Sequence, residues 1–127
     1  MVRIIHFEQN EVAAEHIVPP PEKCSAGNPA QKIWNHYTDP TGLFFSGVWQ
    51  GEPCVLNVQY AKHEEEFCML IEGEVLLTGS DGVAMHLKAG AAFVVPGGFV
   101  GTWQNLTPVK KYYAIMHIAD PESMGLS

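Results

Sequence analysis

The sequence has few basic residues and no long apolar runs. Seven basic residues against fourteen acidic ones leave a formal net charge of −7. This balance excludes a phosphate-backbone partner, because nucleic-acid binding requires a cationic face. It also disfavours adhesion to anionic membranes, and no apolar stretch approaches the ~20 residues of a membrane span. We therefore expect neither nucleic acid nor membrane among the partners.

The sequence also lacks the cysteine pattern of a secreted disulfide scaffold. Cys24, Cys54 and Cys68 are an odd number without C-x-x-C spacing, which favours reduced thiols. The first sixteen residues lack the apolar core of a secretory signal. Neither a phosphate-binding glycine loop nor a G-x-S-x-G nucleophile elbow occurs. These features predict a cytoplasmic protein.

Turn residues are plentiful, with 12 glycines and 9 prolines among 127 residues. From residue 43 onward, short apolar stretches alternate with turn signals at the spacing typical of an all-β sandwich or barrel. The predicted strands are 43–50, 54–61, 66–71, 75–78, 83–87, 92–95, 99–104 and 110–118. The strand at 66–71 is apolar on both faces, which predicts a central strand covered on both sides.

We expect residues 1–127 to form one domain, because the length suits a single ordinary domain. Residues 43–118 are its barrel core. Residues 1–42 are predicted to supply a strand at 2–7, a proline-rich extended arm at 18–30 and a turn at 39–42.

Two groups of residues resemble the motifs of the cupin superfamily. Glu66, then six intervening residues and Gly73, matches the second half of G-x5-H-x-H-x3-4-E-x6-G. The second motif, G-x5-P-x-G-x2-H-x3-N, is matched by Gly90, Pro96, Gly98 and Asn105. This resemblance implies an all-β, RmlC-like cupin fold, a small jelly-roll barrel.

Longer stretches are similar to one branch of that superfamily. EFCMLIEGEVLL, FVVPGGFVGTW and PVKKYYAI resemble the (S)-ureidoglycine aminohydrolase-type cupin domain, and the resemblance covers residues 25–116. Ala91 departs from the pattern, since such cupins usually carry Asp after the glycine.

In metal-binding cupins, three histidines and the glutamate hold one metal ion. Here the histidine positions are occupied by Tyr60, Lys62 and Gly101, and Glu66 alone is retained. A divalent metal needs three or more N, O or S donors, and an ammonium repels it. The resemblance therefore implies no metal and no other cofactor. An alternative route to a metal through His63, Glu64 and Glu65 stays open, although alternation points the first and last of these away from the pocket.

The same alternation predicts a pocket for a small polar molecule. Its residues are Tyr60, Lys62, Glu66 and Cys68 on one wall, with Gly101 and Trp103 opposite. Gly101 is expected to leave space where an imidazole would lie, and Lys62 and Glu66 to neutralise each other. Two interpretations remain open: an ion pair that plugs a dead site, and a true ligand pocket.

The predicted function is small-molecule binding without the usual metal ligands. The alternatives are a ureidoglycine aminohydrolase-like enzyme acting on a small ureido or amide compound, and a metal-free isomerase or epimerase using Lys62, Glu66 or Tyr60. No catalytic residue is assigned, and whether a reaction occurs stays open. Open sheet edges and the habit of the resembled family predict a homodimer.

Overall fold

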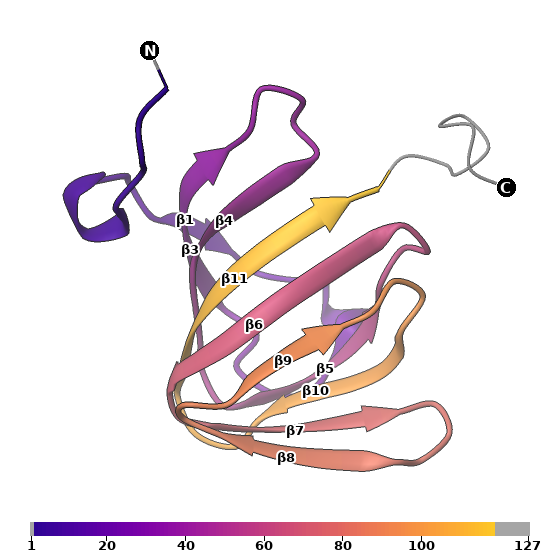
Figure 1. The fold of residues 1–127 in the computed structure, drawn as a ribbon. Coiled ribbons are helices and arrows are strands. Elements are labelled where there is room, and N and C mark those ends of the chain that lie inside the picture. The colour runs from indigo at the N-terminus through magenta and orange to yellow at the C-terminus, as the bar shows by residue number, and fades with distance from the viewer. Residues whose placement is uncertain (1, 119–127) are drawn as a thin grey trace, which may run out of the picture.

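Two antiparallel sheets face each other in the computed structural model, which describes residues 2–118 (Figure 1). The first, sheet A, has the order β1-β3-β4-β11-β6-β9. Its strands are β1 Glu15–Ile17, β3 Gln31–Thr38, β4 Phe44–Gly51, β11 Val109–His117, β6 Glu64–Glu72 and β9 Ala92–Val95.

The second, sheet B, has the order β2-β5-β10-β7-β8. Its strands are β2 Cys24–Gly27, β5 Cys54–Gln59, β10 Val100–Asn105, β7 Glu74–Gly79 and β8 Ala84–Lys88. Two single 3-10 turns, η1 Phe7–Gln9 and η2 Pro21–Lys23, are the helical elements of the described residues. No helix in this part of the chain is long and apolar enough to cross a membrane.

The predicted all-β jelly roll is confirmed. Each strand expected after residue 43 is present, and β9 has the predicted bounds, 92–95. The Gly79-Ser80-Asp81-Gly82 stretch, rich in turn residues, forms the hairpin that joins β7 to β8. Turn chemistry and period-2 alternation therefore sufficed to locate the barrel strands.

The N-terminal part differs from the prediction. Residues 2–7 form no strand; instead η1 begins at Phe7, whose ring stacks on His36 with centroids 4.7 Å apart. The Asn10 amide donates to the His36 carbonyl oxygen at 2.7 Å, and the His36 Nδ1 donates to the Asn10 carbonyl oxygen at 2.8 Å. Side-chain contacts, which strand periodicity does not encode, attach this segment to sheet A.

The proline-rich stretch and the residues after it contribute to the sheets. Within 18–30, η2 is followed by β2, which pairs with β5, and residues 31–38 form β3, which pairs with β4. The aspartate–proline turn signal at 39–42 does close the β3–β4 hairpin, where the Asp39 side chain accepts from the Leu43 and Phe44 amides. Barrel strands thus begin before residue 43.

Strand β6 is covered on one face only, so the prediction of a strand covered on both sides is wrong. Glu66, Cys68 and Leu70 point into the barrel and are buried, whereas Phe67 and Met69 are 46% and 39% exposed. Two packed sheets bury only their inner faces. Apolar residues on the outer face of β6 therefore are not explained by the packing of this chain.

Two glycines have similar positive φ values but different surroundings. Comparing their substitution by alanine distinguishes the free-energy cost of a left-handed backbone conformation from the cost of a steric clash. Gly73 (φ +90°), between β6 and β7, lies so close to the connection between β10 and β11 that a Cβ would collide with the Pro108 carbonyl oxygen, whereas Gly82 (φ +82°) faces open space. We expect Gly82→Ala to lower the free energy of unfolding by about 1 kcal/mol, the cost of positive φ alone. Gly73→Ala should cost roughly 3 kcal/mol, because a backbone clash adds to that strain.

Urea denaturation followed by circular dichroism measures both values. Equal losses for the two variants would show that the contact between Gly73 and Pro108 does not constrain the barrel.

Candidate functional site

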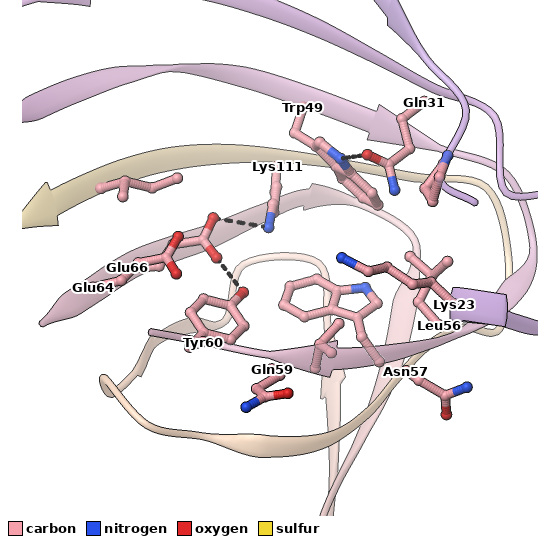
Figure 2. Close-up of a pocket in the computed structure, with 14 residues that line it drawn as sticks. Lys23, Gln31, Trp49, Leu56, Asn57, Gln59, Tyr60, Glu64, Glu66 and Lys111 are labelled. Carbon is pink, nitrogen blue, oxygen red and sulfur yellow. Dashed lines mark hydrogen bonds and ion pairs between the residues drawn. The ribbon is translucent and has the colours of Figure 1, made fainter. Parts of the chain in front are cut away.

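A buried ion pair lies between the two sheets. The Lys111 ammonium on β11 lies 3.1 Å from Glu66 Oε2 on β6, and each side chain is only 6% exposed (Figure 2). Lys111 is in register with Leu70 rather than with Glu66, so its long stem runs along the sheet to reach the carboxylate. The two residues are 45 positions apart in sequence, and the pairing of β6 with β11 brings them together.

Further contacts surround both charges. The Tyr60 hydroxyl donates to Glu66 Oε1 at 2.5 Å, so each carboxylate oxygen has its own donor. The Lys111 ammonium also lies 3.6 Å from the Cys68 sulfur and 4.1 Å from the centroid of the Trp103 ring. No buried side-chain nitrogen or oxygen atom in the described part of the chain is left without a hydrogen bond, which is what a buried charge requires.

This environment sets the protonation states at neutral pH. Burial acts to lower the pKa of Lys111, but the Glu66 carboxylate and Cys68 outweigh it and raise that pKa above its ordinary value. Lys111 therefore stabilises the fold fully below the ordinary lysine pKa, and this contribution is lost as the pH rises through the raised pKa.

Tyr60 and Cys68 stay neutral. Burial, and next the Glu66 carboxylate, raise the pKa of the Tyr60 hydroxyl. Burial raises the pKa of the Cys68 thiol to about 12 although Lys111 acts in the opposite direction. A thiol with so high a pKa is a poor nucleophile, so the chemistry available here is hydrogen bonding and charge stabilisation.

The ion pair forms part of the wall of a cavity of about 290 Å³. Trp49 and Trp103 provide aromatic surface, and their rings meet edge to face at 6.0 Å. The Trp49 Nε1 donates to Gln31 Oε1 at 3.0 Å (Figure 2). The remaining polar lining is contributed by Lys23, Asn57, Gln59 and Glu64. A small space with aromatic walls and several polar side chains is the usual composition of a small-molecule site.

Four of the six residues predicted from the sequence lie at this centre. Tyr60, Glu66 and Trp103 line the cavity, and Cys68 is fully buried in contact with Lys111. Of the donors weighed as an alternative metal site, Glu64 also lines the cavity.

Lys62 lies elsewhere. It is exposed, and it does not line the cavity. The expected pairing of Lys62 with Glu66 is wrong, since the cation bound to Glu66 is Lys111. The physical reason is that β5 ends at Gln59 and the chain turns before β6 begins, with the Glu64 amide donating to the Ala61 carbonyl oxygen. Alternation along a strand does not continue through such a turn.

Gly101 does not leave the expected space. A Cβ at this position would collide with the carbonyl oxygen of Thr78 on β7, so the neighbouring backbone occupies the position of the imagined imidazole. Gly101 borders a separate groove along β5, β10 and β7. Gly101 instead allows β10 to approach β7 closely, which is another common role of a glycine within a strand.

The sequence reasoning missed Lys111 and Gln31. Lys111 has a detectable signal, because it shares its strand face with Val109 and Tyr113, both buried. A lysine at a core-facing position implies a buried acidic partner. Gln31 has no such signal, since its role depends on Trp49 from the adjacent strand.

The residues do not fit the metal ion that the cupin resemblance would suggest. Within residues 2–118, no three His, Cys, Asp or Glu side chains converge. Both oxygens of Glu66 already accept hydrogen bonds, and one of them faces an ammonium at 3.1 Å. A second cation against this carboxylate would be repelled by Lys111.

Comparisons with known proteins agree with this architecture. The model of the EutQ-like cupin domain matches residues 38–113. No curated protein sequence matches the chain. A solved DUF861-family protein of unknown function from Pseudomonas syringae pv. tomato is 24% identical with a TM-score of 0.73, over 83% of this chain and 45% of that one. The chain therefore spans less than half the length of that protein.

Two further structures are similar along most of their length. A putative ethanolamine utilization protein Q from Salmonella typhimurium is 16% identical, with a TM-score of 0.62 over 83% of this chain and 94% of that one. A predicted oxalate decarboxylase from Thermotoga maritima is 14% identical, with a TM-score of 0.69 over 91% and 100%. At these identities the likeness concerns the fold, and it confirms the predicted cupin jelly roll.

Removing the ammonium tests how far the site depends on the ion pair. Lys111→Met leaves Glu66 buried without its cation, which should lower the free energy of unfolding by about 3–5 kcal/mol. Lys111→Met combined with Glu66→Gln should recover part of that loss, because the uncompensated charge is gone. Lys110→Met is the matched control on the neighbouring, half-exposed position, and should change stability by less than about 0.5 kcal/mol.

Chemical denaturation of the four proteins provides the comparison. Equal stabilities for Lys111→Met and Lys110→Met would contradict a buried, charged Lys111.

Proposed function

Because the chain belongs to the EutQ-like cupin domain family, we propose that it binds a small polar molecule inside the barrel without a metal ion. The Lys111 ammonium provides the positive charge beside Glu66, where metal-binding cupins have a metal ion. The observation that carries this proposal is the hydrogen-bonded series Tyr60–Glu66–Lys111 in the wall of the 290 Å³ cavity.

The open volume beside the ion pair favours a ligand site over a plugged one. An ion pair that only filled the interior of a barrel without a ligand would leave little open volume. The volume of this cavity is instead close to the lower end of the range for small-molecule sites, roughly 300 Å³. Gln31 uses its amide oxygen to accept from Trp49, and its amide nitrogen makes no hydrogen bond within the described residues. That donor is free to orient a ligand.

Charge and shape indicate the ligand class. Lys111 neutralises Glu66 at the inner end, while Lys23 and Glu64 add one charge of each sign to the lining. A highly charged ligand would therefore gain little. Trp49 and Trp103 contribute aromatic wall to the cavity, and an aromatic wall favours a planar group, which supports a small planar amide or monocarboxylate.

A metal-free isomerase or epimerase is the second candidate. Tyr60 and Glu66, two of the residues that the sequence suggested for acid and base roles, both line the cavity and are joined by a hydrogen bond. Lys62, which the sequence also suggested for this role, lies away from the cavity. Ureidoglycine aminohydrolase-like activity is supported by the sequence resemblance alone.

Tryptophan indole signals in ¹H–¹⁵N NMR spectra test binding with an internal control. The chain has three tryptophans; Trp49 and Trp103 line the cavity, whereas Trp34 borders a groove beside η1. We expect benzamide or benzoate, two planar probes of different charge, to shift the Trp49 and Trp103 signals saturably and to leave Trp34 unchanged. Tyr60→Phe removes the hydrogen bond to Glu66 in the cavity wall and should weaken this binding by up to about tenfold, the value of one hydrogen bond, whereas Tyr112→Phe on the exposed outer surface should not.

Zn²⁺ added to the same sample should leave all three signals in place. A saturable shift with one Zn²⁺ per chain would contradict the metal-free mode. If neither probe nor a library of planar amides and carboxylates moves Trp49 or Trp103, the cavity is a structural void and the proposal fails.

A further inference from the structure

A second cavity lies on the inner face of sheet A, next to the cavity that contains the ion pair. Its volume is about 420 Å³. We call it the second cavity, and the cavity beside Lys111 the first cavity. Strands β1, β3, β4, β6 and β11 contribute to its wall, and within residues 2–118 sheet B contributes no lining residue. Sheet B therefore leaves this part of the inner face of sheet A open to a ligand.

The two cavities share part of their wall. Trp49, Glu66 and Ile115 line both of them. In the strand register, Trp49 is paired with Ile33 of the second cavity on one side and with Lys111 of the first cavity on the other. A molecule that covers the Trp49 side chain can therefore extend from one cavity into the other.

The wall of the second cavity is mainly apolar. Ile33, Phe45 and Ile115 line it beside Trp49. Phe45 is in register with Ile115, and cross-strand partners of this kind have their side chains in contact on the same face of the sheet. An apolar group that covers such a surface gains free energy from the water that both release.

The polar side chains at the rim of the second cavity bind one another. The Tyr113 hydroxyl donates to Asn35 Oδ1 at 2.8 Å, and the Asn35 amide donates to Thr38 Oγ1 at 2.8 Å. Gly47 lies between Asn35 and Tyr113 in the register and has no side chain to separate them. Because these groups already have partners, a polar ligand would gain little from them.

The charged residues at the second cavity are acidic. Glu66 is paired with Lys111, and Glu15 on β1 is exposed. Within residues 2–118, no lysine, arginine or histidine lines this cavity, so an anionic group there would lack a cation. An ammonium group would have only the exposed Glu15 as a partner, and exposed ion pairs contribute little. The second cavity therefore favours an uncharged apolar group.

We propose that the second cavity binds an apolar substituent of the molecule whose polar group lies in the first cavity. This inference rests on the proposed function and narrows its ligand class to an amide or monocarboxylate that carries an apolar substituent. Lys23 and Gln31 suit the polar group, since they lie at the opposite end of the first cavity from Glu64 (Figure 2). Because the Trp49 Nε1 donates to Gln31, the substituent of a ligand held there passes along Trp49 into the second cavity.

Isoleucine methyl signals in ¹H–¹³C NMR spectra test the inference. Ile33 lines the second cavity, whereas Ile71 borders the groove beside η1. The parent probe is benzoate or benzamide, whichever binds more tightly, and it should shift the indole signals of Trp49 and Trp103. Its 4-propyl derivative should also shift the Ile33 methyl signal and leave that of Ile71 unchanged.

The affinities of three probes provide the second measurement. Since a fully buried methylene contributes about fourfold in affinity, the propyl group should lower Kd by about tenfold or more. The 4-(2-carboxyethyl) derivative has a substituent of similar length with a negative charge. It should bind no more tightly than the parent probe, because Glu15 is acidic and no cation lines the second cavity.

Ile33→Phe and Ile17→Phe form a matched pair of variants. The larger side chain at position 33 fills part of the second cavity, so the 4-propyl derivative should bind within about threefold of the parent probe. Ile17 on β1 lines neither cavity, and Ile17→Phe should keep the wild-type difference. Because both probes are compared on the same variant, a general loss of stability cancels, and circular dichroism verifies that each variant is folded.

The outcomes distinguish the second cavity from the first. If no probe shifts Trp49 or Trp103, the first cavity binds none of them, and the proposed function and this inference both fail. If the parent probe binds but the propyl group brings no gain, or a gain without a shift of Ile33, the proposed function stands and the second cavity is not a subsite. A carboxyethyl derivative that binds as tightly as the propyl derivative, or a full propyl gain in Ile33→Phe, also contradicts an apolar subsite.

Discussion

The pairing of Lys111 with Glu66 inside the barrel is the interaction on which the rest of the site depends. Moving either charge out of water alone costs several kcal/mol. The structure offsets this cost with the 3.1 Å ion pair, the Tyr60 hydrogen bond to the second carboxylate oxygen and the Trp103 ring beside the ammonium. Because each group is satisfied only while the others stay in place, the pair aligns β6 and β11 and fixes Tyr60 at the cavity. The carboxylate that metal-binding cupins use for a metal thus serves an internal cation here.

Much of the fold could be predicted from the sequence, because local chemistry determines it. Glycines such as Gly73 and Gly82 adopt positive φ at turns, and alternation between them identifies the strands. At the site, motif spacing and local alternation correctly indicated Tyr60, Glu66, Cys68 and Trp103. Lys111 was missed because its partner is 45 residues away, and Lys62 was misplaced because the chain turns between β5 and β6. The core-facing position of Lys111 is a local signal that a buried partner exists, but a local pattern does not identify Glu66 as that partner.

Sheet A has an unusual distribution of polarity across its two faces. Its inner face holds the charged pair at Glu66 and Lys111, while its outer face exposes Phe67, Met69 and Met116. Single strands therefore carry both features: on β6 the buried cavity residue Glu66 directly precedes the exposed Phe67. An exposed apolar outer face reduces solubility unless it is covered.

The charge state of Lys111 is the most direct test of this account. The side-chain ¹⁵Nζ signal of Lys111, assigned by its loss in Lys111→Met, reports whether the nitrogen is an ammonium. The account predicts an ammonium at pH 7 that remains protonated above 10.5, the ordinary pKa of lysine, because the Glu66 carboxylate stabilises it. In Glu66→Gln the same nitrogen should lose its proton at a lower pH, since burial then acts without a compensating charge. A neutral amine at pH 7 in the wild type would contradict the internal cation and, with it, the proposed binding mode.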